Sequence, residues 1–227
     1  MYNDKKILAL IPARGGSKGI KNKNIINLCG KPLISYSIES CKKCDYIDRI
    51  VVSTDSDAIA EVALRYGADV PFKRPNNLAA DTSKTIDAVL HAIDFFNSQG
   101  ERYDVLLLIQ PTQPLRTSGD ITSALEKYFR DEVDLVSVCE VEDNPVLIRT
   151  IEDNKLKKML SVNSTCRRQD FPVYYKVNGC IYINSIDNLS VETSFNDNPG
   201  YFIMERSHSI DIDEPMDLLV AEAIVQI

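Results

Sequence analysis

The amino-acid sequence predicts an α/β fold: one mostly parallel β-sheet with α-helices on both of its faces. Continuous apolar runs of the kind found in strands buried on both faces occur at 7–11, 50–54, 105–109 and 135–139. Segments with apolar residues at helical spacing lie between these runs. Because strand and helix alternate, the strands are expected to run parallel under covering helices. Ligands of such sheets bind beyond the carboxyl ends of the strands, so we expect the site there.

Helices are expected where apolar residues recur three or four positions apart. Pro32 suits the first turn of a helix whose apolar spacing continues to position 41. The segment 57–66 stops at Gly67, a residue that commonly ends helices. Three further helical patterns occupy 86–96, 121–129 and 215–227. The last opens on Asp-Glu-Pro, which suits the positive end of a helix dipole.

The alternation of strand and helix stops between residues 142 and 178. Charged and Asn-rich segments surround short apolar pieces there, and a strand is expected to resume at 179–183. We interpret 142–178 as an insertion, either over the site or as an oligomerisation arm. Because the sequence has no internal repeat and no low-complexity linker, the chain 1–227 is expected to form one domain.

The charge of the chain is unevenly distributed. Its 227 residues include 26 Lys or Arg and 33 Asp or Glu, so the net charge is −7. Residues 1–31 carry seven Lys or Arg against one Asp, a net charge of +6, whereas the remainder carries −13. The acidic balance argues against a general binder of nucleic acid or of anionic membranes. The cations gathered in residues 1–31 indicate an anion-binding site.

The sequence also predicts the cellular compartment in which the protein is found. The apolar run near the start is too short for a secretion signal, and no uncharged stretch approaches the roughly 18 residues that a membrane span needs. Six cysteines without a secretion signal are expected to be free thiols in a reducing cytoplasm. Cys41 and Cys44 form a lone pair, and His91 and His208 are not spaced to complete a zinc site with them. We therefore expect a cytoplasmic protein that does not bind membranes.

A glycine-rich basic loop follows the first expected strand. Residues 12–19 read Pro-Ala-Arg-Gly-Gly-Ser-Lys-Gly, and Ile-Lys-Asn-Lys-Asn follows. Exposed amides, a serine hydroxyl and several cations make this loop a cradle for a polyphosphate; the cations are Arg14, Lys18, Lys21 and Lys23. The loop is neither a P-loop nor G-x-G-x-x-G, because Gly15 and Gly16 are adjacent. The alternative is a solvated flexible loop, but the position directly after a buried strand favours phosphate binding.

Two carboxylates near the end of the chain form a second candidate site. Asp211 and Asp213 are two residues apart, so in an extended segment both side chains point the same way. Magnesium prefers one or two carboxylates together with phosphate oxygens and waters. The alternative is that Asp213 only caps the last helix and Asp211 is solvated, and spacing does not decide between the two.

Two further polar loops are expected near the carboxyl edge of the sheet. The segment 110–116 contains two prolines and presents Gln110 and Arg116 directly after a buried strand. In the segment 74–85, Ser83 and Thr85 are candidates for contacts with a nucleotide. The alternatives are a turn before a helix in the first segment and capping of a helix in the second.

The scarcity of histidine limits the catalytic mechanisms that this sequence can support. Neither of the two histidines lies in a motif, so a Ser-His-Asp or Cys-His site is not expected. Phosphoryl or nucleotidyl transfer needs positioning and charge neutralisation rather than a protein nucleophile. The cations and carboxylates of this sequence fit that requirement.

These segments resemble the acylneuraminate cytidylyltransferase family. The matching blocks occur in the family's order and cover nearly the whole chain: 13–24, 50–55, 74–75, 78–82, 110–116, 178–183 and 210–213. The resemblance implies a Rossmann-like, nucleotidyltransferase-type sheet. It also implies transfer of CMP from CTP to the anomeric hydroxyl of a nine-carbon α-keto acid sugar, with release of pyrophosphate and with Mg²⁺ as cofactor. The insertion 142–178 would be the family's dimerisation arm in a homodimer.

The resemblance also implies roles for individual residues. The nucleotide would be bound by Leu10, Ala13, Arg14, Gly15, Ser17, Lys23, Asn24, Arg74, Ser83 and Thr85. The sugar would be bound by Gln110, Arg167, Gln169, Lys176 and Tyr182. Asp211 and Asp213 would hold the metal, and the catalytic residues would be Arg14, Lys23 and Asp211.

One position departs from the family pattern. Many relatives read Arg-Pro-Asn-Gly where this chain reads Lys-Val-Asn-Gly from Lys176. Lysine keeps the positive charge but cannot bind a carboxylate in a bidentate manner, which affects the choice of sugar. N-acetylneuraminic acid is the first expectation, legionaminic or pseudaminic acid the alternative, and the eight-carbon acid Kdo less favoured. A non-catalytic module that senses CTP is a competing class, and the missing G-x-G-x-x-G disfavours an NAD-dependent oxidoreductase.

Overall fold

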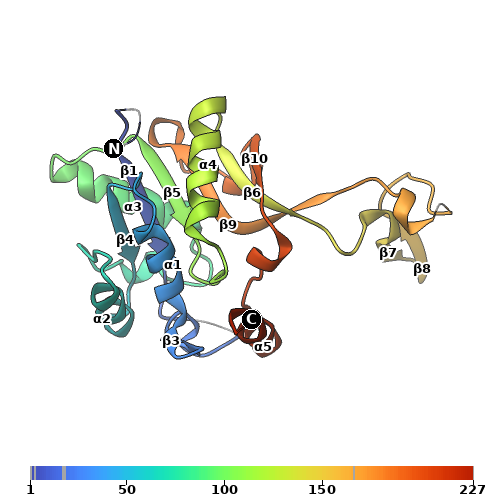
Figure 1. The fold of residues 1–227 in the computed structure, drawn as a ribbon, viewed down its shortest axis with the longest axis horizontal. Coiled ribbons are helices and arrows are strands. Elements are labelled where there is room, and N and C mark those ends of the chain that lie inside the picture. Colours follow the sequence, from blue (N-terminus) through green and yellow to red (C-terminus); the bar gives the residue numbers. More distant parts are fainter. Residues whose placement is uncertain (1, 3, 17–18, 166, 227) are drawn as a thin grey trace.

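A six-stranded β-sheet with helices around it forms the body of the protein in the computed structural model, which describes all residues except 1, 3, 17–18, 166 and 227 (Figure 1). The strands lie in the order β10-β6-β9-β5-β1-β4. Their bounds are β1 Ile7–Pro12, β4 Arg49–Ser53, β5 Val105–Ile109, β6 Leu135–Glu140, β9 Tyr175–Ser185 and β10 Gly200–Ile203. Within the described chain five of these strands run in one direction and β9 runs against them. The mostly parallel sheet is therefore confirmed.

Helices cover both faces of the sheet, as expected. Successive side chains of a strand point to opposite faces. Ile7, Ala9 and Ile11 of β1 pack in one hydrophobic cluster with α1, α2 and α4, whereas Leu8 and Leu10 pack in another with α3. The helices span α1 Leu33–Lys42, α2 Asp57–Tyr66, α3 Thr85–Ser98, α4 Ser118–Asp131 and α5 Pro215–Val225. Burial on both faces explains why the strands read as continuous apolar runs.

The ends of the helices follow from local sequence. Gly67 adopts a left-handed conformation with φ of 90° and caps α2, as its position predicted. At α4, Thr117 and Asp120 exchange hydrogen bonds in a capping box. Pro32 differs from expectation: it does not lie inside the helix but pairs in a short hairpin of β2 Asn27–Leu28 with β3 Lys31–Pro32, and α1 begins at the next residue.

Strand β9 begins four residues before the strand expected at 179–183. Its first residues pair with the end of β6, where Lys176 lies opposite Cys139 and Val177 opposite Val138. Residues 175–178 of the expected insertion therefore belong to the sheet. Tyr175, Lys176 and Val177 are all exposed, because this part of β9 extends beyond the buried centre of the sheet. It therefore lacks the continuous apolar run that marks the other strands in the sequence.

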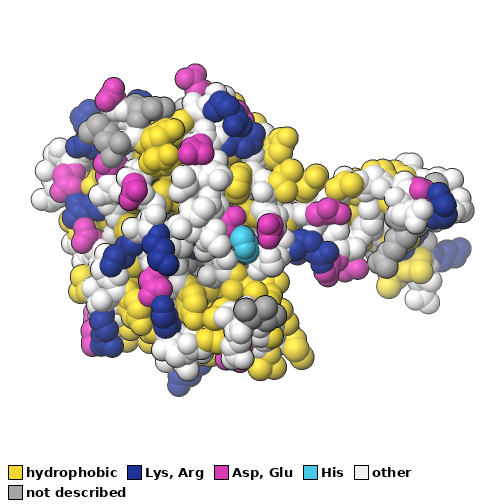
Figure 2. Space-filling model, in the orientation of Figure 1, with side chains coloured by type: hydrophobic (Ala, Val, Ile, Leu, Met, Phe, Trp, Pro, Cys, Tyr) yellow, Lys and Arg dark blue, Asp and Glu magenta, His cyan; other side chains and the backbone are white. Residues whose placement is uncertain are grey.

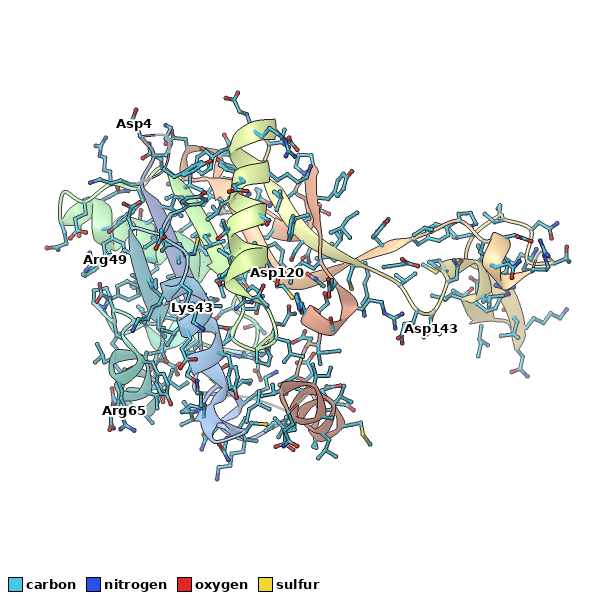
Figure 3. The ribbon with its side chains drawn as sticks, in the orientation of Figure 1. Asp4, Lys43, Arg49, Arg65, Asp120 and Asp143 are labelled. Atoms are coloured by element: carbon cyan, nitrogen blue, oxygen red, sulfur yellow. The ribbon has the colours of Figure 1, made fainter. Side chains whose placement is uncertain are left out.

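The segment between β6 and β9 projects from the body as an arm (Figure 1). Its outer end carries a hairpin of β7 Arg149–Glu152 and β8 Lys155–Lys158. Asp143 lies on the stretch that joins the body to this hairpin (Figure 3). The most exposed large apolar side chains of the described arm are Ile151 at 75%, Leu156 at 71% and Met159 at 61%. Figure 2 shows the narrow connection between the arm and the body.

A small satellite core lies apart from the main sheet. It joins Ile20 of the basic loop, Leu28 of β2, Leu33 of α1, Ile212 of the acidic segment and Ala221 of α5. Segments that are far apart in the sequence, and that carry the candidate phosphate and metal residues, therefore pack against one hydrophobic cluster.

Cys41 and Cys44 are buried in the main core beside the end of α1, and the cysteines of the described chain are free thiols. Within the described residues, none of the helices has the length and apolar character needed to cross a membrane.

Candidate active site

A cavity of about 760 Å³ opens at the carboxyl ends of β1, β4 and β5, the edge where the sequence places the site. The loops after β1 and β5, the start of α3, the middle of β9 and the acidic segment before α5 line it. Ten predicted site residues lie on its wall: Arg14, Lys23, Asn24, Arg74, Ser83, Thr85, Gln110, Tyr182, Asp211 and Asp213. The tertiary structure thus gathers residues from five segments of the sequence into one site.

The basic loop after β1 forms one wall of the cavity. Arg14 Nη1 lies 2.7 Å from a carboxylate oxygen of Asp81, across the mouth of the cavity. Asn24 is buried and donates a hydrogen bond of 2.9 Å from Nδ2 to the carbonyl oxygen of Arg14. The N–H of Gly15 donates to Oδ1 of Asp55 over 2.8 Å. The loop is therefore held by hydrogen bonds to its own backbone and to Asp55. Of its described cations, Arg14 and Lys23 line the cavity, whereas Lys21 is exposed outside it.

Arg74 is a buried cation at the end of β4. Its Nε donates to Ser53 Oγ over 3.0 Å, and Nη2 donates to the carbonyl oxygen of Ser53. Burial lowers the pKa of Arg74, a tendency that Asp55 opposes and Arg14 reinforces. A buried guanidinium beside a second arginine is suited to a strongly anionic ligand.

The acidic pair behaves as its spacing predicts. Asp211 and Asp213 both line the cavity, whereas Ile212 between them is fully buried in the satellite core. The N–H of Ile212 donates to the carbonyl oxygen of Thr112 over 2.9 Å, which ties the segment to the loop after β5. Burial raises the pKa of Asp211, as does the neighbouring charge of Asp213; contacts with Thr112, Gln113 and Lys23 oppose the rise.

The carboxylate oxygens of the cavity suit a magnesium ion that is also bound by phosphate oxygens and waters. Within the described residues no group of three or more His, Cys, Asp or Glu side chains could enclose a metal ion. Two converging carboxylates that repel one another remain, and a cation relieves that repulsion. Magnesium commonly takes one or two carboxylates and completes its shell with phosphate oxygens and waters. The pair therefore fits magnesium that arrives with a polyphosphate.

Part of the cavity wall is polar and uncharged. Tyr182 donates from its hydroxyl to Asn196 Oδ1 over 3.0 Å, and burial raises its pKa to about 12. Gln110 lies beside it on the cavity wall. This part of the wall can exchange hydrogen bonds with a polyhydroxylated ligand but adds little charge.

Several predicted site residues do not line this cavity. Leu10 and Ala13 are fully buried in the core, and of residues 10–13 only Pro12 reaches the wall. Arg167 and Gln169 lie on the arm, where Arg167 pairs with Asp170 at 2.9 Å. Lys176 lines a second cavity at the base of the arm. Ser17 lies outside the described residues.

Arg116 is placed differently from the sequence expectation. It does not face the cavity but is buried, with 2% of its surface exposed. It donates from Nη1 to the carbonyl oxygen of Cys180 over 2.9 Å and from Nη2 to Ser37 Oγ over 2.8 Å. The guanidinium therefore supports the floor of the site by joining β9 to α1.

The sequence also missed residues of the cavity. Gln113 and Thr112 lie in the recognised 110–116 segment, where the expectation singled out only its two ends. Asn178 opens the recognised 178–183 block and accepts a hydrogen bond from Gln113 Nε2 through its carbonyl oxygen. Asn196 carries no motif in the sequence and reaches Tyr182 only through the fold.

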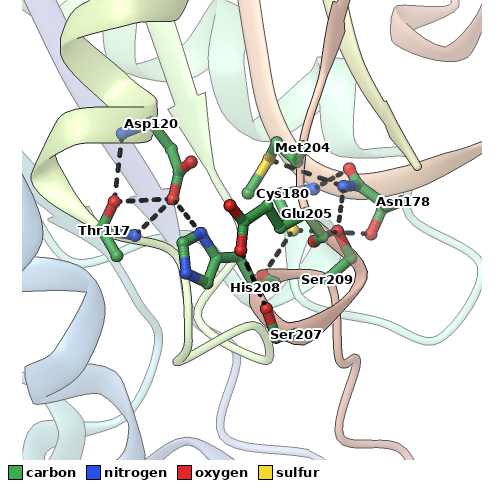
Figure 4. Close-up of polar contacts among 9 residues, drawn as sticks. All are labelled: Thr117, Asp120, Asn178, Cys180, Met204, Glu205, Ser207, His208 and Ser209. Atoms are coloured by element: carbon green, nitrogen blue, oxygen red, sulfur yellow. Dashed lines mark hydrogen bonds and ion pairs between the residues drawn. The ribbon is translucent and has the colours of Figure 1, made fainter. Parts of the chain in front are cut away.

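The turn that precedes the acidic pair is anchored to two elements (Figure 4). His208 Nδ1 lies 2.9 Å from the carboxylate of Asp120, which lies in the first turn of α4 and accepts a hydrogen bond from the N–H of the N-cap residue Thr117 (Figures 3 and 4). Asn178 Nδ2 donates to Ser209 Oγ over 2.8 Å. His208 is thus a structural residue, and the acidic pair follows a turn whose position is fixed.

Comparison with known proteins agrees with this geometry. A family model described as cytidylyltransferase matches residues 8–217. The chain is 39% identical over 228 residues to post-translational flagellin modification protein B of Campylobacter coli, covering 97% of this chain and 95% of that protein. It is 37% identical to CMP-N,N'-diacetyllegionaminic acid synthase of Legionella pneumophila, covering 98% of this chain and 97% of that protein.

Two further similarities extend the comparison. The chain is 34% identical to N-acylneuraminate cytidylyltransferase of Escherichia coli over 97% of its own length, but it spans only 52% of that protein. The solved structure of CMP:2-keto-3-deoxy-manno-octonic acid synthetase, complexed with CTP, has the same fold with a TM-score of 0.72 at 18% identity, covering 97% of this chain and 98% of that one. The family match and the full-length relatives together show that the chain belongs to the cytidylyltransferase family.

Proposed function

We propose that the protein transfers CMP from CTP to the anomeric hydroxyl of a nine-carbon α-keto acid sugar, a nonulosonic acid, and releases pyrophosphate. The observation that carries this proposal is one cavity that joins three cations, Arg14, Lys23 and Arg74, to the carboxylates Asp211 and Asp213. Triphosphate needs the cations, and a divalent ion needs the carboxylates. A polar wall beyond them is left for the acceptor sugar.

In this mechanism the oxygen of the sugar's anomeric hydroxyl attacks the α-phosphate in line with the departing pyrophosphate, and the hydroxyl proton is released to solvent. Arg14 and Lys23 neutralise charge that develops on the phosphate oxygens. Arg74, fixed by Ser53, holds its guanidinium without reorganisation when the nucleotide binds. Positioned charge is the main catalytic contribution for such a transfer, so no protein nucleophile is required.

Asp211 and Asp213 would hold Mg²⁺, and their donor set fits this ion once phosphate oxygens and waters complete its shell. When bound, the ion would supply further neutralisation of the phosphate oxygens. The contribution of the chain is the fixed direction of the two carboxylates, which the buried Ile212 and its hydrogen bond to Thr112 maintain.

Gln110 and Tyr182 are proposed to bind the sugar, and a second copy of the chain is proposed to complete its site. Arg167 and Gln169, the residues assigned to the sugar by resemblance, lie on the projecting arm. The arm also exposes apolar side chains of the kind that interfaces bury. We propose a homodimer in which each arm, 142–174, packs on the partner subunit.

Among nonulosonic acids, an N,N'-diacetylated sugar of the legionaminic type is proposed ahead of N-acetylneuraminic acid, which reverses the order expected from the sequence. The relative named for N,N'-diacetyllegionaminic acid matches 98% of this chain over 97% of its own length. The relative named for N-acylneuraminate is about twice as long and somewhat less identical. These matches favour the first sugar, and the acceptor wall of the cavity provides polar groups for either.

The test is pyrophosphate release with CTP and a panel of purified acceptors: N,N'-diacetyllegionaminic, pseudaminic, N-acetylneuraminic and Kdo. The expected result is CMP-sugar product, identified by mass spectrometry, with the highest kcat/KM for the legionaminic acid and none with ATP, GTP or UTP. A higher kcat/KM for N-acetylneuraminic acid would instead identify that sugar as the preferred acceptor, as expected from the sequence. CTP binding without any product from the panel would support a non-catalytic nucleotide-binding module instead.

A further inference from the structure

The end of β4 carries a carboxylate to which neither the sequence nor the proposed mechanism assigns a role. We propose that Asp55 is a positioning residue that holds the backbone of the basic loop in its phosphate-binding shape. The inference deepens the proposed function and rests on it, because the loop is taken to bind CTP. Asp55 itself is not proposed to touch the nucleotide.

The central contact is the hydrogen bond from the Gly15 N–H to Asp55 Oδ1, 2.8 Å long. Gly15 follows Arg14 directly, so this bond fixes the peptide from which the Arg14 side chain departs. A hydrogen bond to a charged acceptor stabilises more than a neutral one. The two residues are 40 positions apart, and the bond joins the loop after β1 to the loop after β4.

Asp55 is itself fixed on both sides. The N–H of Ser56 donates to Thr54 Oγ1 over 3.1 Å, and Ser56 is the N-cap of α2. On the other side, the carbonyl oxygen of Thr54 accepts a hydrogen bond of 2.8 Å from the N–H of Arg74. The carboxylate therefore projects from a turn held between strand and helix, and it offers Gly15 an acceptor in a defined place.

The loop also lies close against this turn. A Cβ atom at Gly15 would lie 3.1 Å from Ser56 Cβ and 3.5 Å from Asp55 Oδ2. Contacts of 3.1 Å are tighter than ordinary van der Waals distance, so the glycine permits the approach that the hydrogen bond needs. The loop backbone and the Asp55 turn are thus packed together as well as bonded.

The same turn organises the second arginine of the site. Ser53, two residues before Asp55, accepts hydrogen bonds from Arg74 through its hydroxyl and carbonyl oxygens. Asp55 also stabilises the charged form of Arg74 electrostatically. The end of β4 therefore sets the positions of both arginines that we assign to the nucleotide, Arg74 directly and Arg14 through Gly15.

A positioning role explains why a carboxylate lies near a triphosphate cradle at all. A negative charge close to the phosphates weakens their binding by repulsion. If charge were its only effect, removing Asp55 would strengthen CTP binding. If the bond to Gly15 dominates, removal weakens CTP binding, and an uncharged side chain that keeps the acceptor oxygen restores it.

The test compares Asp55→Ala with Asp55→Asn, which keeps the acceptor oxygen and removes the charge. Hydrogen exchange of the Gly15 amide in the free protein and the Kd for CTP are measured for both. We expect Asp55→Ala to lose protection at Gly15 and to bind CTP about tenfold more weakly. Asp55→Asn is expected to keep the protection and to bind CTP within about threefold of the wild type, or more tightly.

The matched control is Asp57→Asn, which removes a carboxylate two residues away that is 87% exposed and pairs with Lys73. It is expected to leave Gly15 exchange and the CTP Kd unchanged within about twofold. If Asp55→Ala does not fold, Asp55→Ser serves the same purpose, since its shorter side chain also removes the accepting carboxylate oxygen. Thermal unfolding of each variant identifies that case.

Equal Gly15 exchange and equal CTP affinity in the Ala and Asn variants would overturn the role of Asp55. Tighter CTP binding by both variants would overturn it as well, because charge would then be the dominant effect. Failure of the wild-type chain to bind CTP would contradict the proposed function alone. The contrast in Gly15 exchange would still decide whether Asp55 fixes the loop.

Discussion

Lys23 Nζ lies 2.8 Å from Oδ1 of Asp213. This ion pair joins the basic loop after β1 to the acidic segment before α5, two segments that are 190 residues apart. A cation assigned to phosphate and a carboxylate assigned to magnesium therefore neutralise one another. If both ligands bound, magnesium would take the place of the Lys23 cation beside Asp213, and phosphate would take the place of the Asp213 carboxylate beside Lys23. Each residue would then keep a partner of opposite charge, so the two ligands are expected to bind jointly.

Replacement of Lys23 by alanine is expected to lower kcat about 100-fold, because one charge that stabilises the transition state is lost. The Lys23 side chain is mostly buried by the cavity wall, with 16% of it exposed. Lys21→Ala is the matched control, since Lys21 is an exposed cation of the same loop and does not line the cavity. Steady-state kinetics of pyrophosphate release give the comparison. Equal kcat values for the two variants would remove Lys23 from the mechanism.

Asp211→Asn is expected to raise the magnesium concentration for half-maximal activity at least about tenfold, because a neutral amide binds the ion more weakly. Mn²⁺ binding, followed by electron paramagnetic resonance in the presence of CTP, gives a readout that does not depend on turnover. Asp187→Asn, an exposed carboxylate in the turn after β9, serves as the control. An unchanged Mn²⁺ affinity in Asp211→Asn would contradict its role as a ligand.

Gly19 is expected to be intolerant of a side chain. A Cβ atom there would lie 2.4 Å from the carbonyl oxygen of Asp213, whereas a Cβ atom at Gly16 would meet nothing within 4 Å. Gly19→Ala should therefore destabilise the protein by about 1–3 kcal/mol and lower the Tm, because the basic and acidic segments must separate. Gly16→Ala should leave the Tm nearly unchanged. Differential scanning calorimetry makes the comparison, and similar Tm values would show that the two segments separate without cost.

His91 makes the stability of the fold depend on pH. Its pKa lies below the ordinary 6.5 because the ring is partly buried and Arg74 repels the protonated form, although Asp94 opposes these effects. The unfolded chain then binds the proton more readily than the folded one, so stability is full above pH 6.5 and falls as the pH drops toward the lowered pKa. Thermal unfolding at pH 7.5 and 5.5 should show a smaller loss of Tm in His91→Gln than in the wild type. Parallel losses in the two proteins would contradict this assignment.

The arm is expected to hold a dimer together. Replacing Ile151 and Leu156 together by serine removes two apolar side chains that are 75% and 71% exposed, and should convert the dimer to a monomer with an intact body. Leu64→Ser, at a position of α2 that is 57% exposed, is the control and should not change the assembly. Analytical ultracentrifugation measures the mass. A double-serine variant that sediments as the wild type does would place any dimer contact elsewhere.

Residue patterns predicted most of the fold for a clear physical reason. Strands buried on both faces must be continuously apolar, so β1, β5 and β6 can be identified from their runs of apolar residues alone. The outer half of β9 is half-exposed, and its residues from Tyr175 to Asn178 read as part of the insertion. The direction of β9 depends on its partners β5 and β6, which are distant in sequence, so no local pattern reports it.

In the candidate site, too, local motifs predicted some residues, whereas others became apparent only from contacts between distant segments. Motifs at Arg14, Gln110 and Asp211 mark its segments, because the first two follow strands β1 and β5 and the third precedes helix α5. The same motif reasoning assigned Arg116 to the open edge, where the fold buries it beneath the site. Asn196 was not predicted, since a single asparagine in a loop has no spacing partner to mark it.

The sequence by itself determined the class of the sheet, the segments that carry charge and the alternation that points Asp211 and Asp213 the same way. These are local properties, set by periodicity, chain direction and the order of charges along the chain. The tertiary structure alone decided that Lys23 meets Asp213, that Gly19 abuts the same residue and that Asp55 holds Gly15. Each of these contacts joins residues that are 40 or more positions apart, and only the packing of the sheet and the satellite core brings such residues together.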